Sequence, residues 1–177
     1  YYTAGSTAGD RVGNAQTIAK GQWNLKETTK LAEDYSKIAD PAGTVVMATN
    51  GDYFNMGTGE PTGYLIMEGN VIKTSYEPYF AILTDGSAVI RDAGTPTDDV
   101  MEAVSGPLYL LKDGKIEVSP DGSMNPRNSV GIRADGSVVF FMAEGRLAPR
   151  SIGMDCYEVA AILKDAGCVT ALYLDGG

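Results

Sequence analysis

The sequence ends in an acidic residue that follows an apolar run and precedes two glycines. The run covers residues 171–174, and Asp175, Gly176 and Gly177 come after it. A carboxylate just past a buried strand, beside backbone that carries no side chains, is well placed to reach a ligand. Asp175 is therefore the first candidate for a catalytic carboxylate.

The absence of histidine limits the chemistry. With no His in 177 residues, a Ser-His-Asp centre, a Cys-His centre and a His-ligated zinc or iron site are all excluded. Catalysis must rest on Asp, Glu, Tyr, Lys, Arg, hydroxyl groups or backbone. The residues single out no cofactor; a metal, if one binds, would be a hard cation held by oxygen ligands, such as calcium or magnesium.

The two cysteines bracket a helical pattern. Cys156 and Cys168 would be separated by about 18 Å if the residues between them are helical, whereas a disulfide needs Cα atoms within about 7 Å. We expect no disulfide between them. Two buried, inert thiols are favoured over a reactive cysteine.

Length and charge narrow the class of protein. The chain has 177 residues, of which 44% are hydrophobic, so we expect one compact domain over residues 1–177. Its net charge of −9 argues against nucleic acid or an anionic membrane as the main partner, but leaves room for a small phosphorylated ligand held by one or two arginines. No apolar run reaches the roughly 20 residues of a membrane span, and residues 1–10 do not resemble a signal peptide. The oligomeric state is not indicated.

Glycine-containing turns of one kind separate short alternating strands. Asp-Gly pairs predict hairpins with type I′ turns over residues 81–90, 108–118 and 132–141, and Glu68-Gly69-Asn70 predicts another between residues 64–67 and 71–73. The acids in these turns are interpreted as structural.

Glycine-containing turns of a second kind follow strands predicted from continuous apolar runs. Residues 44–49 precede Asn50-Gly51-Asp52, residues 138–143 precede Glu144-Gly145-Arg146, and residues 171–174 precede Asp175. Continuous apolar runs predict strands that are buried on both faces, as central or parallel strands are. Their polar C-terminal ends could therefore converge on one rim of the sheet.

Two helices complete the predicted framework. Residues 27–39 form the first, and Pro41-Ala42-Gly43 would end it before residue 44. Residues 155–166 form the second, with Val159, Ile162, Leu163 and Ala166 on its buried side and Gly167 at its C-terminal cap. If the strands from Val138 and Val169 are adjacent, they form a right-handed βαβ unit with this helix, and Glu144 and Asp175 lie at the same sheet end. We therefore expect an α+β fold of mixed, largely antiparallel sheets with hairpins, a βαβ portion and helices packed on the outside.

Five blocks that run in order through the sequence resemble the phosphodiester glycosidase family. They are 49–54 (Thr-Asn-Gly-Asp-Tyr-Phe), 126–132 (Pro-Arg-Asn-Ser-Val-Gly-Ile), 144–146 (Glu-Gly-Arg), 151–154 (Ser-Ile-Gly-Met) with Glu158, and 174–177 (Leu-Asp-Gly-Gly). The resemblance implies hydrolysis of a sugar-1-phosphodiester, such as a GlcNAc-1-phosphodiester, to free sugar and a phosphomonoester. It also implies a glycan partner, an extracellular or cell-surface location, and a connection with exopolysaccharide in bacteria.

The sequence departs from the family pattern at three places. Asn128 stands where the family more often has Thr, and Glu144 stands where it more often has Asp. The family motif also continues beyond the two glycines with further Gly and Ser residues. The domain is therefore expected to be truncated at its C-terminal end.

The resemblance and the chemistry together assign roles to residues. Asp175 would activate water or attack the sugar, and Arg127 would bind phosphate, with Arg146 as the second choice. Glu158 is either catalytic or, through Asp155-x-x-Glu158, part of a helix capping box, and the resemblance favours catalysis. The further substrate-binding candidates are Asn50, Gly51, Asp52, Glu144, Ser151, Gly176 and Gly177, while Tyr53 and Phe54 are interpreted as core residues.

Two other functions stay open. The chain could be a non-catalytic carbohydrate-binding or envelope-structural module of the same fold. A general phosphodiesterase acting at phosphorus is disfavoured, because a binuclear metal site normally draws on more ligands than a chain without His provides.

Overall fold

The computed structural model describes residues 23, 27–38 and 45–176, which group into two compact units. The first unit contains the helix α2 (Thr28–Ile38), predicted from the sequence, and a turn closed by a bridge between Phe54 and Pro61. The second unit comprises Asn50–Tyr53 and the chain from Thr62 onward. The expected helix stop at residues 41–43 lies outside the described residues.

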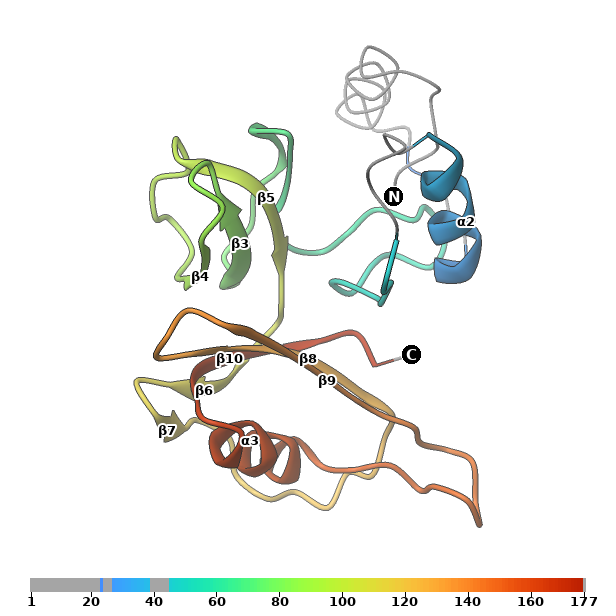
Figure 1. Cartoon of the computed structure of the whole chain (residues 1–177). Helices are drawn as coiled ribbons and strands as arrows, with labels where there is room; N and C mark the ends of the chain where they lie inside the picture. The colour runs from blue at the N-terminus through green and yellow to red at the C-terminus, as the bar shows by residue number, and fades with distance from the viewer. Residues whose placement is uncertain (1–22, 24–26, 39–44, 177) are drawn as a thin grey trace. The chain divides into compact units, whose positions relative to one another are not determined.

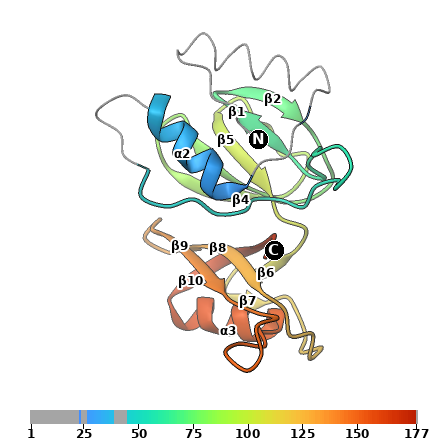
Figure 2. The ribbon, with the colours of Figure 1, turned by 90° about the vertical axis from the view of Figure 1, so that its right-hand side faces the viewer.

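The second unit contains two five-stranded sheets (Figures 1 and 2). The first sheet has the order β2-β1-β5-β3-β4, and the second has the order β7-β6-β10-β8-β9. The strands of the first sheet are β1 (Leu65–Met67), β2 (Asn70–Lys73), β3 (Tyr79–Leu83), β4 (Ala88–Arg91) and β5 (Val100–Ser105). Those of the second are β6 (Tyr109–Lys112), β7 (Lys115–Ile116), β8 (Arg127–Arg133), β9 (Val138–Ala143) and β10 (Cys168–Leu174).

All four predicted hairpins are confirmed. They join β1 to β2, β3 to β4, β6 to β7 and β8 to β9. The turn type was wrong in two of them: at Asp85-Gly86 and Asp135-Gly136 only the glycine has positive φ. In both, the Asp carboxylate accepts hydrogen bonds from the N–H and hydroxyl of the Ser two residues later, and this local bonding sets a different turn.

The helix α3 (Cys156–Asp165) lies along one face of the second sheet (Figures 1 and 2). Val159, Ala160 and Leu163 are buried against residues of β6 and β10, whereas Ile162, which we expected on the buried side, is 39% exposed. Gly167 has φ +88° and ends the helix, as predicted. Both cysteines are free thiols, and burial raises the pKa of each.

The predicted βαβ unit is present, with one difference. β8 pairs antiparallel with both β9 and β10, so β9 and β10 run parallel with β8 between them rather than side by side. Ala143 is paired with Arg127, and Leu174 with Asn128. Glu144 and Asp175 therefore follow strands that end at the same edge of the sheet, as expected. The α+β class is confirmed, with few helices.

The strand predicted over residues 44–49 was wrong. Residues 45–49 are described, and they form no strand. Val46 is 94% exposed and Met47 is exposed as well, so their side chains do not fill a core. Apolar composition alone does not make a strand, because a strand also needs a neighbour that takes its backbone hydrogen bonds.

Candidate active site

Asp175 lies where the second sheet meets the loop that begins at Asn50. It directly follows β10 and is half-buried, and its N–H donates a 2.8 Å hydrogen bond to the carbonyl of Gly51. Although the strand expected before Asn50 is absent, the residues after it still reach the end of β10. The structure thus brings together two of the three predicted strand-end segments through a backbone contact.

Two tyrosines and an arginine accompany Asp175. The side chains of Tyr173 on β10 and Arg127 on β8 lie on the same face of the sheet. The Arg127 guanidinium lies 5.4 Å from the centre of the Tyr173 ring. Tyr53, from the loop, has its ring centre 6.0 Å from that of Tyr173. We call Asp175, Tyr173, Arg127 and Tyr53 the strand-end cluster.

The phenol of Tyr53 stays protonated at physiological pH. Burial raises its pKa well above the ordinary value, and the hydrogen bond to Tyr173 and the nearby charge of Asp175 act in the same direction. The positive charge of Arg127 opposes them with a smaller effect. Tyr53 is nevertheless 40% exposed, so its assignment to the core was wrong. Tyr53 thus presents a neutral, partly exposed phenol near the negative charge of Asp175.

Arg127 is used mainly inside the protein. It is 7% exposed, and Nε donates to the carbonyl of Met154 at 2.7 Å. Nη2 donates to the carbonyl and hydroxyl of Ser123, and Nη1 donates to the Tyr173 hydroxyl at 3.4 Å. Nε and Nη2 therefore hold the loops at 122–126 and 151–155 against the start of β8, and Nη1 links Arg127 to β10.

Asp52 is buried and holds its own loop together. Its carboxylate accepts hydrogen bonds from the N–H of Tyr53 at 2.7 Å, the hydroxyl of Thr62 at 3.0 Å, and the N–H of Gly63. Burial raises its pKa, and these hydrogen bonds partly offset the effect. A Cβ at Gly63 would collide with Ser105 and with this carboxylate, so glycine is required there. Asp52 thus positions the loop that carries Tyr53.

Glu77 is a second acid near Asp52, and it was not among the residues predicted from the sequence. Its Oε2 atom is buried and has no hydrogen-bond partner among the described residues. Burial raises its pKa, and the nearby Asp52 carboxylate raises it further. The carbonyl of the next residue, Pro78, accepts a hydrogen bond from the N–H of Gly106. Gly106 in turn lies so close to the carbonyl of Tyr173 that a Cβ would not fit there.

The glycines of the predicted motifs allow close backbone approach. A Cβ at Gly51 would lie 2.8 Å from Val104, and one at Gly176 would collide with the carbonyl of Pro126. A Cβ at Gly145 would collide with the other side of Pro126. Pro126 is thus held between the segments that follow β9 and β10. Gly177 lies outside the described residues.

Glu144 and Ser151 close the loop after β9. The Ser151 hydroxyl donates to the carbonyl of Glu144 at 2.6 Å, and the Glu144 carboxylate accepts a 2.6 Å hydrogen bond from Arg150. Glu144 is exposed, so this ion pair lies at the surface. Arg146 is exposed, has φ +56°, and donates from Nε and Nη2 to the side-chain carbonyl of Asn125. This loop reaches the strand-end cluster through Asn125 and Pro126.

Glu158 occupies the capping position. Its N–H donates to the Asp155 carboxylate at 2.8 Å, and its own carboxylate accepts from the N–H of Asp155 at 3.0 Å. The capping box predicted as the structural alternative is therefore present at the start of α3. Glu158 is exposed, and its recorded hydrogen bonds serve the helix end.

Replacing Glu158 separates its two possible roles. Glu158→Ala is expected to lower the free energy of unfolding by about 1 kcal/mol, whereas Glu158→Gln, which keeps an oxygen acceptor, should change it by less than about 0.5 kcal/mol. Urea denaturation measures both, and Asp155→Ala serves as the matched cap variant. If the Gln variant lost the hydrolytic activity that the family resemblance implies while keeping its stability, a purely capping role would be contradicted.

The residues that the structure describes contain no group of three or more His, Cys, Asp or Glu side chains placed to hold a metal ion. Nor does any helix in this described part have the length and apolar character needed to cross a membrane.

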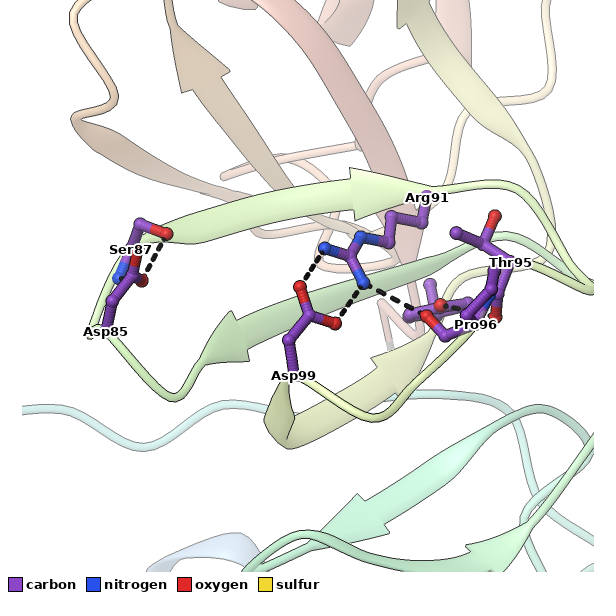
Figure 3. A network of polar contacts seen from close by, with 7 residues as sticks. Asp85, Ser87, Arg91, Thr95, Pro96 and Asp99 are labelled. Atoms are coloured by element: carbon purple, nitrogen blue, oxygen red, sulfur yellow. Dashed lines mark hydrogen bonds and ion pairs between the residues drawn. The ribbon is translucent and has the colours of Figure 1, made fainter.

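A second polar network lies in the first sheet (Figure 3). Arg91 donates to both carboxylate oxygens of Asp99 at 2.7 Å and to the carbonyl of Pro96 at 3.1 Å. A shallow surface cavity of about 390 Å³ borders these residues together with Thr95 and Asp98. Because the bidentate pair with Asp99 raises the pKa of Arg91 and occupies its guanidinium, this network fixes the loop between β4 and β5.

Sequence reasoning missed Tyr173 and Asn128 as members of the site. Both are side chains able to hydrogen-bond at buried strand positions, Asn128 in β8 and Tyr173 in the largely apolar β10. Neither is selected by spacing, because their partners lie far away in the sequence. Tyr173 lies two residues before Asp175, but only the pairing of β8 with β10 brings Asn128 beside Asp175 and Arg127 beside Tyr173.

Comparison with known proteins supports the sequence resemblance. The family model for phosphodiester glycosidase matches residues 43–177. N-acetylglucosamine-1-phosphodiester alpha-N-acetylglucosaminidase from Mus musculus is 29% identical over 165 residues, which cover 78% of this chain and 31% of the mouse protein. The Homo sapiens protein of the same name is 26% identical over 160 residues, covering 74% and 30%, respectively. The chain thus spans about a third of the length of these relatives.

The structural comparison agrees. The solved structure of the zebrafish N-acetylglucosamine-1-phosphodiester alpha-N-acetylglucosaminidase catalytic domain, described as auto-inhibited by its pro-peptide, matches with a TM-score of 0.59 and 26% identity. The match covers 72% of this chain and 50% of the zebrafish chain. The ordered motifs, the family model and the shared fold lead to one conclusion: the chain belongs to the phosphodiester glycosidase family.

Proposed function

We propose that this protein hydrolyses a glycosyl-1-phosphodiester, of the GlcNAc-1-phosphodiester type, to free sugar and a phosphomonoester. The observation that carries the proposal is the strand-end cluster, in which Asp175 lies beside Tyr53, Tyr173 and Arg127 in a member of this family. The curated relatives are named for this chemistry.

The reaction needs one well-placed carboxylate. The bond to the anomeric carbon breaks through an oxocarbenium-like state, and the phosphate that leaves is already a stable anion. Protonation of the leaving group is therefore less important than for an ordinary glycoside. Asp175 takes the essential role in the proposal, either activating a water molecule or attacking the anomeric carbon. Glu158 is assigned to the helix cap instead.

The two arginines are proposed to divide the work on the phosphate side. Arg127 supplies a fixed positive charge near Asp175 while its nitrogens hold the surrounding loops. Arg146 is exposed and is the better candidate for direct contact with phosphate oxygens. Glu144 and Ser151 support this role indirectly, because they close the loop that carries Arg146.

The sugar side is proposed to rest on Tyr53 and the loop around it. The exposed part of the Tyr53 side chain is suited to packing against a pyranose. Asn50, Gly51 and Gly176 would bring backbone close to the ligand, and Asp52 would keep Tyr53 in position.

The experiment is incubation of the complete protein with a synthetic GlcNAc-1-phosphodiester in water enriched in oxygen-18. We expect free GlcNAc that carries the label at its anomeric carbon, together with an unlabelled phosphomonoester. Label in the phosphate would mean attack at phosphorus and would exclude glycosidic cleavage. Binding of the sugar without turnover would favour the non-catalytic carbohydrate-binding module.

We also propose that the natural substrate is an extracellular or cell-surface glycan. The family resemblance supports this location, and fractionation of cells that express the complete protein tests it. Recovery of the protein with the cytosolic fraction alone would contradict it.

A further inference from the structure

Asn128 joins the two segments that form the candidate site. It lies on β8 opposite Leu174 of β10, and it is 3% exposed. Its Nδ2 donates a 2.8 Å hydrogen bond to the carbonyl of Asn50 and a 3.3 Å hydrogen bond to the carbonyl of Asp175. One side-chain amide thus bridges residues that lie 78 and 47 positions away in the sequence.

The orientation of this amide is fixed by its partners. Both neighbouring groups are carbonyl acceptors, so the nitrogen must face them and the oxygen must face away. Within the described residues, that oxygen, Oδ1, is buried and accepts no hydrogen bond. A buried acceptor without a partner is unfavourable, so an amide at this position is not explained by stability alone.

The amide is explained by the need for two N–H donors at one point, one for the carbonyl of Asn50 and one for the carbonyl of Asp175. The Asn50 loop carries Asp52 and Tyr53. β10 carries Tyr173 and is followed directly by Asp175, which also donates from its N–H to the carbonyl of Gly51. Asn128 fastens these two segments to a third, the start of β8, where Arg127 lies. Its two hydrogen bonds therefore define where Asp175 stands relative to Tyr53 and Arg127.

We propose that Asn128 is a positioning residue for Asp175, acting through its two carbonyl contacts and not by touching substrate. The inference rests on the proposed function for its consequence in catalysis. The geometry that it requires, an ordered end of β10 held by the Asn128 amide, is measurable without any activity.

The principal variant is Asn128→Asp, which keeps the shape of the side chain but replaces the two donors by an acceptor. Its kcat is expected to fall by about tenfold to a hundredfold with KM within about twofold, because a small displacement of a reacting group is costly. Asn128→Thr keeps one donor in a strand-compatible side chain. Its kcat should lie between that of the wild-type protein and that of Asn128→Asp. Equal kcat in all three proteins would overturn the proposal.

A matched control is present in the same unit. The Nδ2 of Asn70 also donates to two carbonyls, those of Met67 and Glu68, but Asn70 is an exposed residue at the start of β2, beside the hairpin turn. Asn70→Asp removes the same kind of contact away from the site, and its kcat should match that of wild type. A comparable fall in kcat would mean that the effect of Asn128→Asp is not specific to the site.

A double-mutant cycle tests whether Asn128 acts through Asp175. In the Asp175→Asn background, Asn128→Thr should change kcat by less than about twofold, although it lowers kcat of the wild-type protein. Full additivity of the two effects would show that Asn128 acts independently of Asp175, and the proposal would fail.

Amide hydrogen exchange provides the arm that does not depend on activity. The Asp175 N–H, bonded to Gly51, should exchange about tenfold faster in Asn128→Thr than in wild type, while the Gly69 N–H, bonded to Met101, should not change. If wild type releases no sugar but shows this difference, the proposed function fails and the positioning role stands. Unchanged exchange at Asp175 overturns the positioning role, whatever the activity.

Discussion

Asp175→Asn is expected to lower kcat for GlcNAc-1-phosphodiester hydrolysis by about a thousandfold or more. The substitution keeps the size of the side chain and the backbone contact to Gly51, so the strand end should stay in place. It removes the negative charge that activates water or attacks the anomeric carbon, and general-base or nucleophilic action of this kind contributes about 10² to 10⁴ in rate. Steady-state kinetics with quantified free sugar measures the effect.

A turn acid provides the control for this substitution. Asp113 lies in the exposed turn between β6 and β7 with φ +51°, a conformation that Asn also accepts readily. Asp113→Asn removes one negative charge from the same unit and should leave kcat within about twofold of wild type. Comparable rates for Asp175→Asn and wild type would remove Asp175 from the mechanism.

Arg127→Lys is expected to lower the free energy of unfolding by about 3 kcal/mol, even though the charge is kept. A single ammonium group cannot reach the carbonyl of Met154, the two oxygens of Ser123 and the hydroxyl of Tyr173 at once. Buried acceptors would lose their donors, each at a cost of about 1–3 kcal/mol, offset in part by relaxation. Urea denaturation followed by circular dichroism checks the value.

Arg150→Lys is the corresponding surface substitution. Arg150 forms an exposed ion pair with Glu144, and such pairs contribute little to stability, so a change below about 0.5 kcal/mol is expected. If Arg127→Lys were as stable as Arg150→Lys but had a strongly raised KM, Arg127 would be a phosphate ligand more than a structural residue. That outcome would return Arg127 to the role first predicted for it.

Local signals in the sequence identified much of the fold. Asp-Gly pairs and Glu68-Gly69 marked all four hairpins, because positive φ favours glycine wherever two strands turn tightly. Asp155 and Gly167 marked the ends of α3, because free backbone groups at helix ends need caps. These features depend on residues close together in the sequence, and for that reason they are readable from it.

The errors occurred where burial by distant residues decided the outcome. Residues 45–49 are of the types that form strands, but no strand forms there. Tyr53 is of a type that is often found in cores, yet it is 40% exposed. Ile162 lies on the exposed side of α3 although the spacing favoured the opposite. The spacing of apolar residues predicts which face of an element can be buried. Whether that face is buried depends on residues from other parts of the chain that pack against it.

The sequence by itself determined the family, the hairpins, the helix caps and the acid at the end of β10. It also indicated that the segments after β9 and β10 end at one edge of the sheet, because parallel strands in a βαβ unit share a direction. Only the tertiary structure decided what surrounds Asp175. The insertion of β8 between β9 and β10 places Arg127 beside Tyr173 and lets Asn128 bridge Asn50 and Asp175. Hydrogen bonds between residues dozens of positions apart are set by strand pairing, so the composition of the site emerges only once the sheet has formed.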